Sequence, residues 1–135
     1  MNDYKKKMKH YPHRAYFITL HPHQSRYDEI ENEERTNNFI QEWFRRKAKH
    51  KSISNAEPPA LLTETEHDQA GRPHTHSILV VPRWLSRYGI QSSDFTAAFS
   101  RYADNFYNGS HDIQPLPTPA DYERALRYTQ KEKRL

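Results

Sequence analysis

A predicted β-hairpin constrains the fold of this chain more than any other segment. Residues 74–81 begin with polar side chains and end in an aliphatic run that is typical of a strand. Residues 61–67 are also extended in character, and residues 68–72 contain a glycine that suits a turn between two antiparallel strands. Because side chains alternate between the two faces of a strand, His74 and His76 are expected on the same face.

This face of the hairpin also carries acidic side chains. If Glu66 pairs with His74, parity places Glu64, Glu66, His74 and His76 together. Two imidazoles and a carboxylate suit Mn²⁺ or Mg²⁺, with zinc as a further candidate, because the chain has no cysteine to form a closed thiolate site. The pattern therefore predicts a metal site formed by Glu66, His74 and His76. Glu64 is the alternative carboxylate, and solvent-facing histidines without a metal are the alternative to the site itself.

The remaining elements are predicted from periodicity and boundary residues. They are a central apolar strand at 15–20, a helix at 28–49, a helix at about 91–106, an edge strand at 111–116 and a helix at 118–131. With the hairpin, the order is β-α-β-β-α-β-α. This order predicts an α+β fold with a central antiparallel sheet of four to five strands and helices mainly on one face, similar to the ferredoxin arrangement.

Length and composition predict one domain with a thin core. The 135 residues suit a single domain spanning residues 1–135, in which residues 1–13 form a flexible basic tail. Hydrophobic residues make up only 34% and the mean hydropathy is −1.15, while aromatic residues reach 13%. The core is therefore expected to be small and rich in rings.

The charge balance favours a polyanionic partner. The net charge is +4, and basic residues cluster at 5–9, 45–51 and 124–134, although such runs are often only solvated surface. No apolar stretch approaches the length of a membrane span, and residues 1–10 lack the apolar core of a signal peptide. An intracellular, cytoplasmic location without a membrane partner is expected.

A tyrosine on the last predicted helix is the candidate nucleophile. Tyr128 and Lys131 lie one turn apart and share a face with Arg124, whereas Tyr122 belongs to another stripe and is expected in the core. A metal can polarise a phosphoryl oxygen, and tyrosine can attack phosphorus when its developing phenolate is stabilised. Lys131 suits that stabilisation or protonation of the leaving oxygen. The alternatives are that Tyr128 is an ordinary contact between helix and sheet, and that Lys131 serves the helix C-terminus.

A second histidine pair follows the first strand. His21 and His23 flank Pro22, which removes a backbone donor and marks the end of the strand. This pair is therefore expected in a loop, without a third ligand, and at most as a substrate contact.

These motifs, in their order and spacing, resemble a known family. Phe17-Ile18-Thr19-Leu20, Gly71-Arg72-Pro73-His74-Thr75-His76, and Tyr128 followed by Lys131 are similar to the three motifs of HUH single-strand endonucleases. The closest resemblance is to the rolling-circle replication initiators with a single catalytic tyrosine. In that family a carboxylate often lies eight residues before the first histidine, which is the position of Glu66 here. Thr75 replaces a usually bulky apolar residue, a difference that concerns packing.

The resemblance implies an HUH nuclease fold and a metal-dependent reaction. With Mn²⁺ or Mg²⁺, Tyr128 would nick single-stranded DNA at a replication origin or hairpin of a plasmid or virus, and rejoin it through a 5′-phosphotyrosine intermediate. A separate helicase and host replication proteins are the implied partners, and a homodimer that coordinates two cuts is compatible with this reading. Arg14, Arg72, Arg124 and Arg127 are candidate DNA contacts.

Three other functions compete with this interpretation. A single-strand transposase is the near relative, but its tyrosine is commonly followed four residues later by glutamine, where this chain has Glu132. A non-enzymatic module that binds unpaired nucleic acid also suits a small sheet with aromatic residues and a basic rim. A metal hydrolase that activates water would leave Tyr128 without a role.

Overall fold

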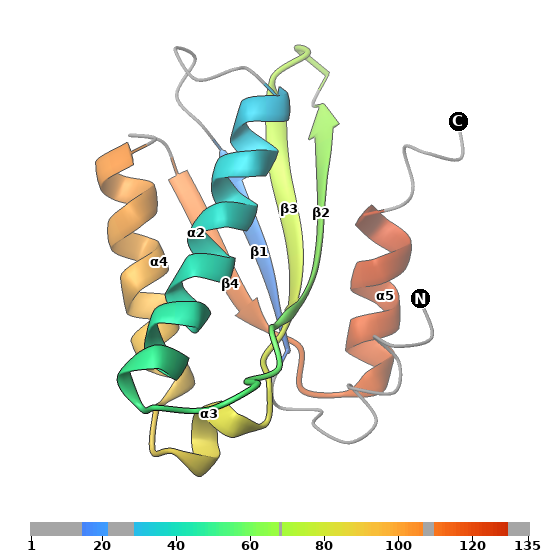
Figure 1. Ribbon diagram of the computed structural model, residues 1–135. Helices are drawn as coiled ribbons and strands as arrows, with labels where there is room; N and C mark the ends of the chain where they lie inside the picture. The colour runs from blue at the N-terminus through green and yellow to red at the C-terminus, as the bar shows by residue number, and fades with distance from the viewer. Residues whose placement is uncertain (1–14, 22–28, 68, 107–109, 130–135) are drawn as a thin grey trace.

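A computed structural model describes residues 15–21, 29–67, 69–106 and 110–129 (Figure 1). Within these ranges the chain forms an α+β fold around a four-stranded antiparallel sheet, as predicted. The basic tail predicted at residues 1–13 lies outside the described residues. The elements are β1 (Ala15–His21), α2 (Glu29–His50), β2 (Ala60–His67), β3 (Pro73–Val80), α3 (Trp84–Arg87), α4 (Ser92–Phe106), β4 (Ser110–Pro115) and α5 (Pro119–Thr129).

The strand order in the sheet is β2-β3-β1-β4, so β1 is central and β4 lies at an edge, both as predicted. The hairpin of β2 and β3 forms as predicted, and its register has the pairing that the shared face requires, with Glu66 opposite His74 and Glu64 opposite His76. Gly71 in the connecting turn has a φ of +79°, a conformation that glycine adopts without steric cost.

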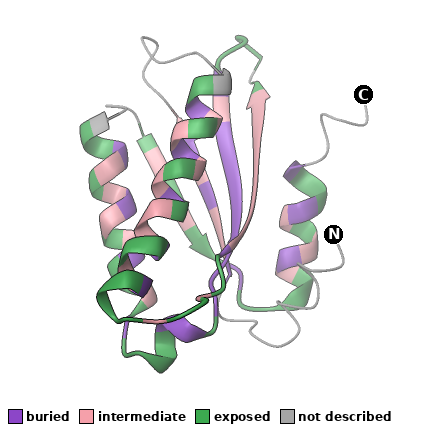
Figure 2. Cartoon of the chain, viewed as in Figure 1, coloured by how far each residue is buried: buried purple, intermediate pink, exposed green. Residues whose placement is uncertain are grey.

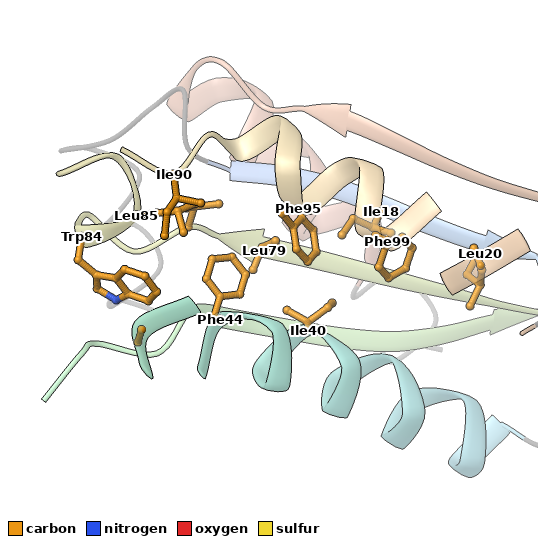
Figure 3. Close-up of a cluster of buried hydrophobic side chains, with 13 residues drawn as sticks. Ile18, Leu20, Ile40, Phe44, Leu79, Trp84, Leu85, Ile90, Phe95 and Phe99 are labelled. Carbon is orange, nitrogen blue, oxygen red and sulfur yellow. The ribbon is translucent and has the colours of Figure 1, made fainter. Parts of the chain in front are cut away.

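The first face of the sheet is covered by α2 and α4 and holds the larger core (Figure 3). The spacing of apolar residues on both helices directs their aromatic rings toward the sheet. Between the helices, Phe44 of α2 packs against Phe95 of α4, with ring centroids 5.4 Å apart. From the strands, Ile18 and Leu79 point to this same face. The abundance of rings in the sequence is explained by this layer.

The opposite face is covered in part by α5 (Figure 1). This helix begins at its predicted cap, where the Asp121 backbone N–H donates to Oγ1 of Thr118 at 3.2 Å. Tyr122 and Leu126 then pack on Ile78 and neighbouring apolar residues of the sheet. The core on this face is smaller, because α5 is only 11 residues long.

Burial differs strongly between the two strands of the hairpin (Figure 2). Nearly every residue of β3 is buried, whereas β2 at the sheet edge is half-buried along its length. Among the described helices, none has the length and apolar character needed to cross a membrane.

Candidate active site

Side chains from three strands and α5 meet on the second face of the sheet, beyond the end of its small core. Parity places Thr19 of β1, His76 of β3 and Glu66 of β2 on this face, and the strand register brings Thr19 directly opposite His76. The last turn of α5 carries Tyr128 over them. These residues form a polar cluster next to an apolar core.

Tyr128 is held in contact with this cluster and still reaches solvent. Its hydroxyl lies 3.3 Å from Oε1 of Glu66 and donates a hydrogen bond to it. Its ring packs edge-on against His76, with centroids 5.5 Å apart, and against Phe17, with centroids 6.1 Å apart. The residue is 47% exposed, so a substrate can approach the hydroxyl.

Tyr122, the rival nucleophile, is only 1% exposed and lies in the core under α5, as predicted. The two tyrosines are therefore separated by burial as well as by helix geometry.

His76 is the most buried polar group of the cluster, with 4% of its surface exposed. Its ring stacks on Phe17 at 5.3 Å, and its Nδ1 lies 3.2 Å from Oγ1 of Thr19. When Nδ1 carries the proton and donates to Thr19, the lone pair is on Nε2. Nε2 then faces Oε2 of Glu66 at 3.1 Å.

The contact between His76 and Glu66 calls for a positive species between the two groups. Nε2 of His76 is close to the carboxylate but has no hydrogen-bond partner with acceptable angles among the described residues. Two lone pairs at this distance repel each other unless a proton or a cation lies between them. Burial favours the neutral ring and so lowers the pKa of His76 below its ordinary value of 6.5, while the Glu66 carboxylate acts in the opposite direction.

The donor chemistry here suits a divalent metal. An ion with ligands about 2.1 Å away at right angles requires two donors about 3.0 Å apart, close to the separation of Nε2 and Oε2. The third predicted ligand, His74, is less well placed, because its ring centroid lies 6.2 Å from that of His76. In the described part of the chain, no three histidine or acidic side chains are arranged as a complete metal-binding group. Glu66 and His76 thus present two donors at a spacing that a metal ion accepts, without a third donor arranged beside them in the described residues.

His21 lies nearer to this site than its sequence context indicates. It is the last residue of β1, and its ring centroid is 4.2 Å from that of His74. The prediction that His21 lies in a loop is wrong, because the strand continues through this residue. His21 comes close to the predicted ligands because β1 pairs with β3 in the sheet. These strands are far apart in the sequence, so no local sequence pattern predicts that His21 lies there.

The two candidate carboxylates differ in their contacts. The carboxylate oxygens of Glu66 lie within 3.3 Å of Nε2 of His76 and of the Tyr128 hydroxyl. Glu64 is the backbone partner of His76 in the strand register. This arrangement favours Glu66 as the ligand. Thr75, between the two histidines, is buried on the first face of the sheet, where its role is packing.

The candidate basic contacts are only partly described. Arg14 and Lys131 lie outside the described residues. Arg72 is exposed in the turn of the hairpin, and Arg124 and Arg127 are exposed on α5, where Arg124 forms an ion pair with Asp121.

Comparison with known proteins adds no relative: no protein-family model, no curated protein and no solved structure matches the chain. Its function is therefore inferred from the residues and their geometry.

Proposed function

We propose that this chain is a divalent-metal-dependent endonuclease of the HUH type, which nicks and rejoins single-stranded DNA through Tyr128. One observation carries the proposal: a single carboxylate contacts both the candidate nucleophile and the candidate metal ligand. Oε1 of Glu66 lies 3.3 Å from the Tyr128 hydroxyl, and Oε2 lies 3.1 Å from Nε2 of His76. An ordinary contact between helix and sheet does not require an exposed hydroxyl over a buried imidazole and a carboxylate.

The chain's own residues account for the chemical step. Oη of Tyr128 attacks phosphorus, its proton passes to Oε1 of Glu66, and the bond from phosphorus to the 3′ oxygen breaks. The products are a 5′-phosphotyrosine and, after protonation of the leaving oxygen, a 3′-hydroxyl. Lys131 is the proposed donor of that proton. Attack of a 3′-hydroxyl on the phosphotyrosine reverses the sequence and rejoins the strand.

Glu66, His76 and a repositioned His74 would hold Mn²⁺ or Mg²⁺, which supplies positive charge to the phosphoryl oxygens. Thr19 orients the ring of His76 through its contact with Nδ1, and Phe17 orients it by stacking on its face. The Glu66 carboxylate therefore has two tasks, which its two oxygens divide.

The proposed substrate is a single strand, because the hydroxyl lies on an open sheet face with rings for unpaired bases. The net charge of +4 favours such a polyanion. By the resemblance of its motifs, the chain is proposed to act at a replication origin or hairpin of a plasmid or virus, together with a helicase and host replication proteins.

A covalent-adduct assay tests this function. The protein is incubated with Mn²⁺ and single-stranded DNA of randomised sequence labelled at its 3′ end, the end that stays on the protein, and the mixture is denatured before electrophoresis. We expect a labelled protein band that disappears with chelator or Tyr128→Phe. It should persist with Tyr122→Phe and with Tyr88→Phe, since Tyr88 matches Tyr128 in exposure at 45%. Metal-dependent cutting without an adduct would indicate a water-activating hydrolase, and binding without cutting a non-enzymatic module.

A further inference from the structure

A groove lies beside Tyr128, on the side of α5 that faces β4. It has a volume of about 710 Å³ and is lined by Phe17, Gln114, Pro115, Leu116, Ala125 and Tyr128, with charged residues of α5 beside them. Pockets that bind small ligands typically measure about 300–1,000 Å³, so one nucleoside fits. The groove does not include Glu66, His74 or His76.

We propose that this groove binds one base of the DNA, the base next to the phosphate that Tyr128 attacks, and that it sets a sequence preference there. The inference rests on the proposed function and adds to it a position at which the enzyme distinguishes bases.

The walls of the groove suit a flat, unpaired base. Phe17 contributes an aromatic ring from β1, and Pro115 and Leu116 at the end of β4 contribute aliphatic surface. Ala125 lies three residues before Tyr128 on α5, and its small side chain leaves the space between helix and strand open. Stacking on such rings accepts any base, so discrimination needs a hydrogen-bonding group. The Gln114 amide is such a group: its Nε2 donates to Oδ2 of Asp112 at 2.7 Å, and its second N–H and its Oε1 are the atoms proposed to contact the base.

The position of the groove links it to the reaction. Phe17 stacks on His76 with ring planes 18° apart, and it also contacts Tyr128 edge-on. Tyr128 thus stands between the Glu66 and His76 pair on one side and the groove on the other. A strand whose phosphate lies at the hydroxyl has its neighbouring base at the mouth of the groove.

Charge at the mouth is consistent with a nucleotide. Arg124, Arg127 and Asp121 line the groove, and both arginines are exposed, so two positive charges stand against one negative charge. Arg124 forms an ion pair with Asp121, which orients its guanidinium. Phosphates on either side of the seated base can contact these cations without burying them. The groove therefore offers apolar walls to the base and a positive rim to the backbone.

The test compares two alanine substitutions on the same helix. Ala125→Leu fills the groove, whereas Ala120→Leu adds the same side chain at an exposed site in the first turn of α5. Wild type and both variants are incubated with Mn²⁺ and single-stranded DNA of randomised sequence. The DNA in the adducts and the released fragments that end in a 3′-hydroxyl are sequenced, so that the bases on both sides of the cut are read.

We expect a base preference at one position next to the cut in wild type and Ala120→Leu. In Ala125→Leu the preference should be lost, because the base no longer reaches the Gln114 amide, and the adduct yield should fall by at least about fivefold, the lower limit for losing one stacked base. Gln114→Ala, at an exposed residue, provides a second variant if Ala125→Leu fails to fold, and it should change which base is preferred.

The outcomes separate the two proposals. Adducts with an unchanged base preference in Ala125→Leu and Gln114→Ala would overturn the proposal that the groove binds a base, but not the proposed nuclease function. Absence of adducts with the wild-type protein would overturn both.

Discussion

The two faces of the sheet are built from alternate residues of the same strands, yet they differ in chemistry. Ile18 of β1 points into the aromatic layer under α2 and α4, and its neighbour Thr19 points to the opposite face, where it holds His76. The first face buries apolar side chains where α2 and α4 cover it (Figure 3). Its polar strand residues are bonded within the layer, since Thr63 contacts Ser77 and Asn37 and Thr65 contacts Glu33. The second face buries apolar side chains under α5, and its polar residues beyond them reach the exposed Tyr128.

This difference shows how a small chain combines stability with a polar site. A buried imidazole beside a carboxylate costs free energy unless a proton or metal compensates it. The aromatic layer on the first face offsets that cost without touching the site. Substitutions on the first face should therefore change stability, and those on the second should change binding and reactivity.

The largest effect is expected on the first face. Phe99→Ala removes a ring that is fully buried in the aromatic layer, and such changes cost about 3–5 kcal/mol in the free energy of unfolding. Tyr128→Phe, on the second face, loses one exposed hydrogen bond and should cost less than about 1 kcal/mol. Urea denaturation measures both. Equal losses would contradict the division between the faces.

Metal binding should depend on His76. His76→Gln keeps a polar side chain but removes the imidazole, and we expect Mn²⁺ affinity to fall by more than about tenfold. His50→Gln, at an exposed residue at the end of α2, is the matched control and should bind as wild type. Isothermal titration with Mn²⁺ measures the affinities. An unchanged affinity in His76→Gln would remove this histidine from the metal site.

The two glutamates of β2 sharpen the comparison within one face. Glu66→Gln loses the charge that contacts His76 and Tyr128, so the rate of adduct formation should fall by about tenfold. Glu64→Gln changes the same charge two residues away and should have a smaller effect. If Glu64→Gln is the more damaging change, Glu64 is the ligand and the assignment of Glu66 is wrong.

The smallest expected effect is a dependence of stability on pH. Burial lowers the pKa of His76, so below about pH 6.5 the unfolded chain binds a proton that the folded chain does not. Without metal, stability is therefore retained above pH 6.5 and falls as the pH decreases, by at most about 1.4 kcal/mol per pH unit from this group. The free energy of unfolding, measured with urea at several pH values in this range, should depend less steeply on pH for His76→Gln than for wild type. An identical slope would show that His76 does not contribute.

Several features of fold and site followed from local sequence patterns. Alternation along β2 and β3, with Gly71 in the turn, was sufficient to predict the hairpin, and the pairing of Glu66 with His74 that was assumed for the shared face is the one the structure has. Helical spacing on α5 correctly separated buried Tyr122 from exposed Tyr128. These predictions succeed because side-chain direction in a strand or helix depends on nearby residues.

Other features depend on contacts between distant segments. The single turn of α3 was not predicted, because four residues carry no periodicity; a tertiary contact holds it, in which the Trp84 indole N–H donates to the backbone oxygen of Glu57 at 2.7 Å. The place of His21 beside His74 likewise depends on the pairing of β1 with β3. The 6.2 Å separation of the His74 and His76 ring centroids depends on rotamer choice, which residue spacing does not determine.

The most direct test is to identify the residue that becomes linked to DNA. The chain has nine tyrosines, so peptide mapping by mass spectrometry of the purified adduct distinguishes them. We predict that the nucleotide is attached to Tyr128, with the bond between Oη and the 5′ phosphorus. Attachment to another residue, or no attachment in the presence of Mn²⁺ and single-stranded DNA, would contradict the account.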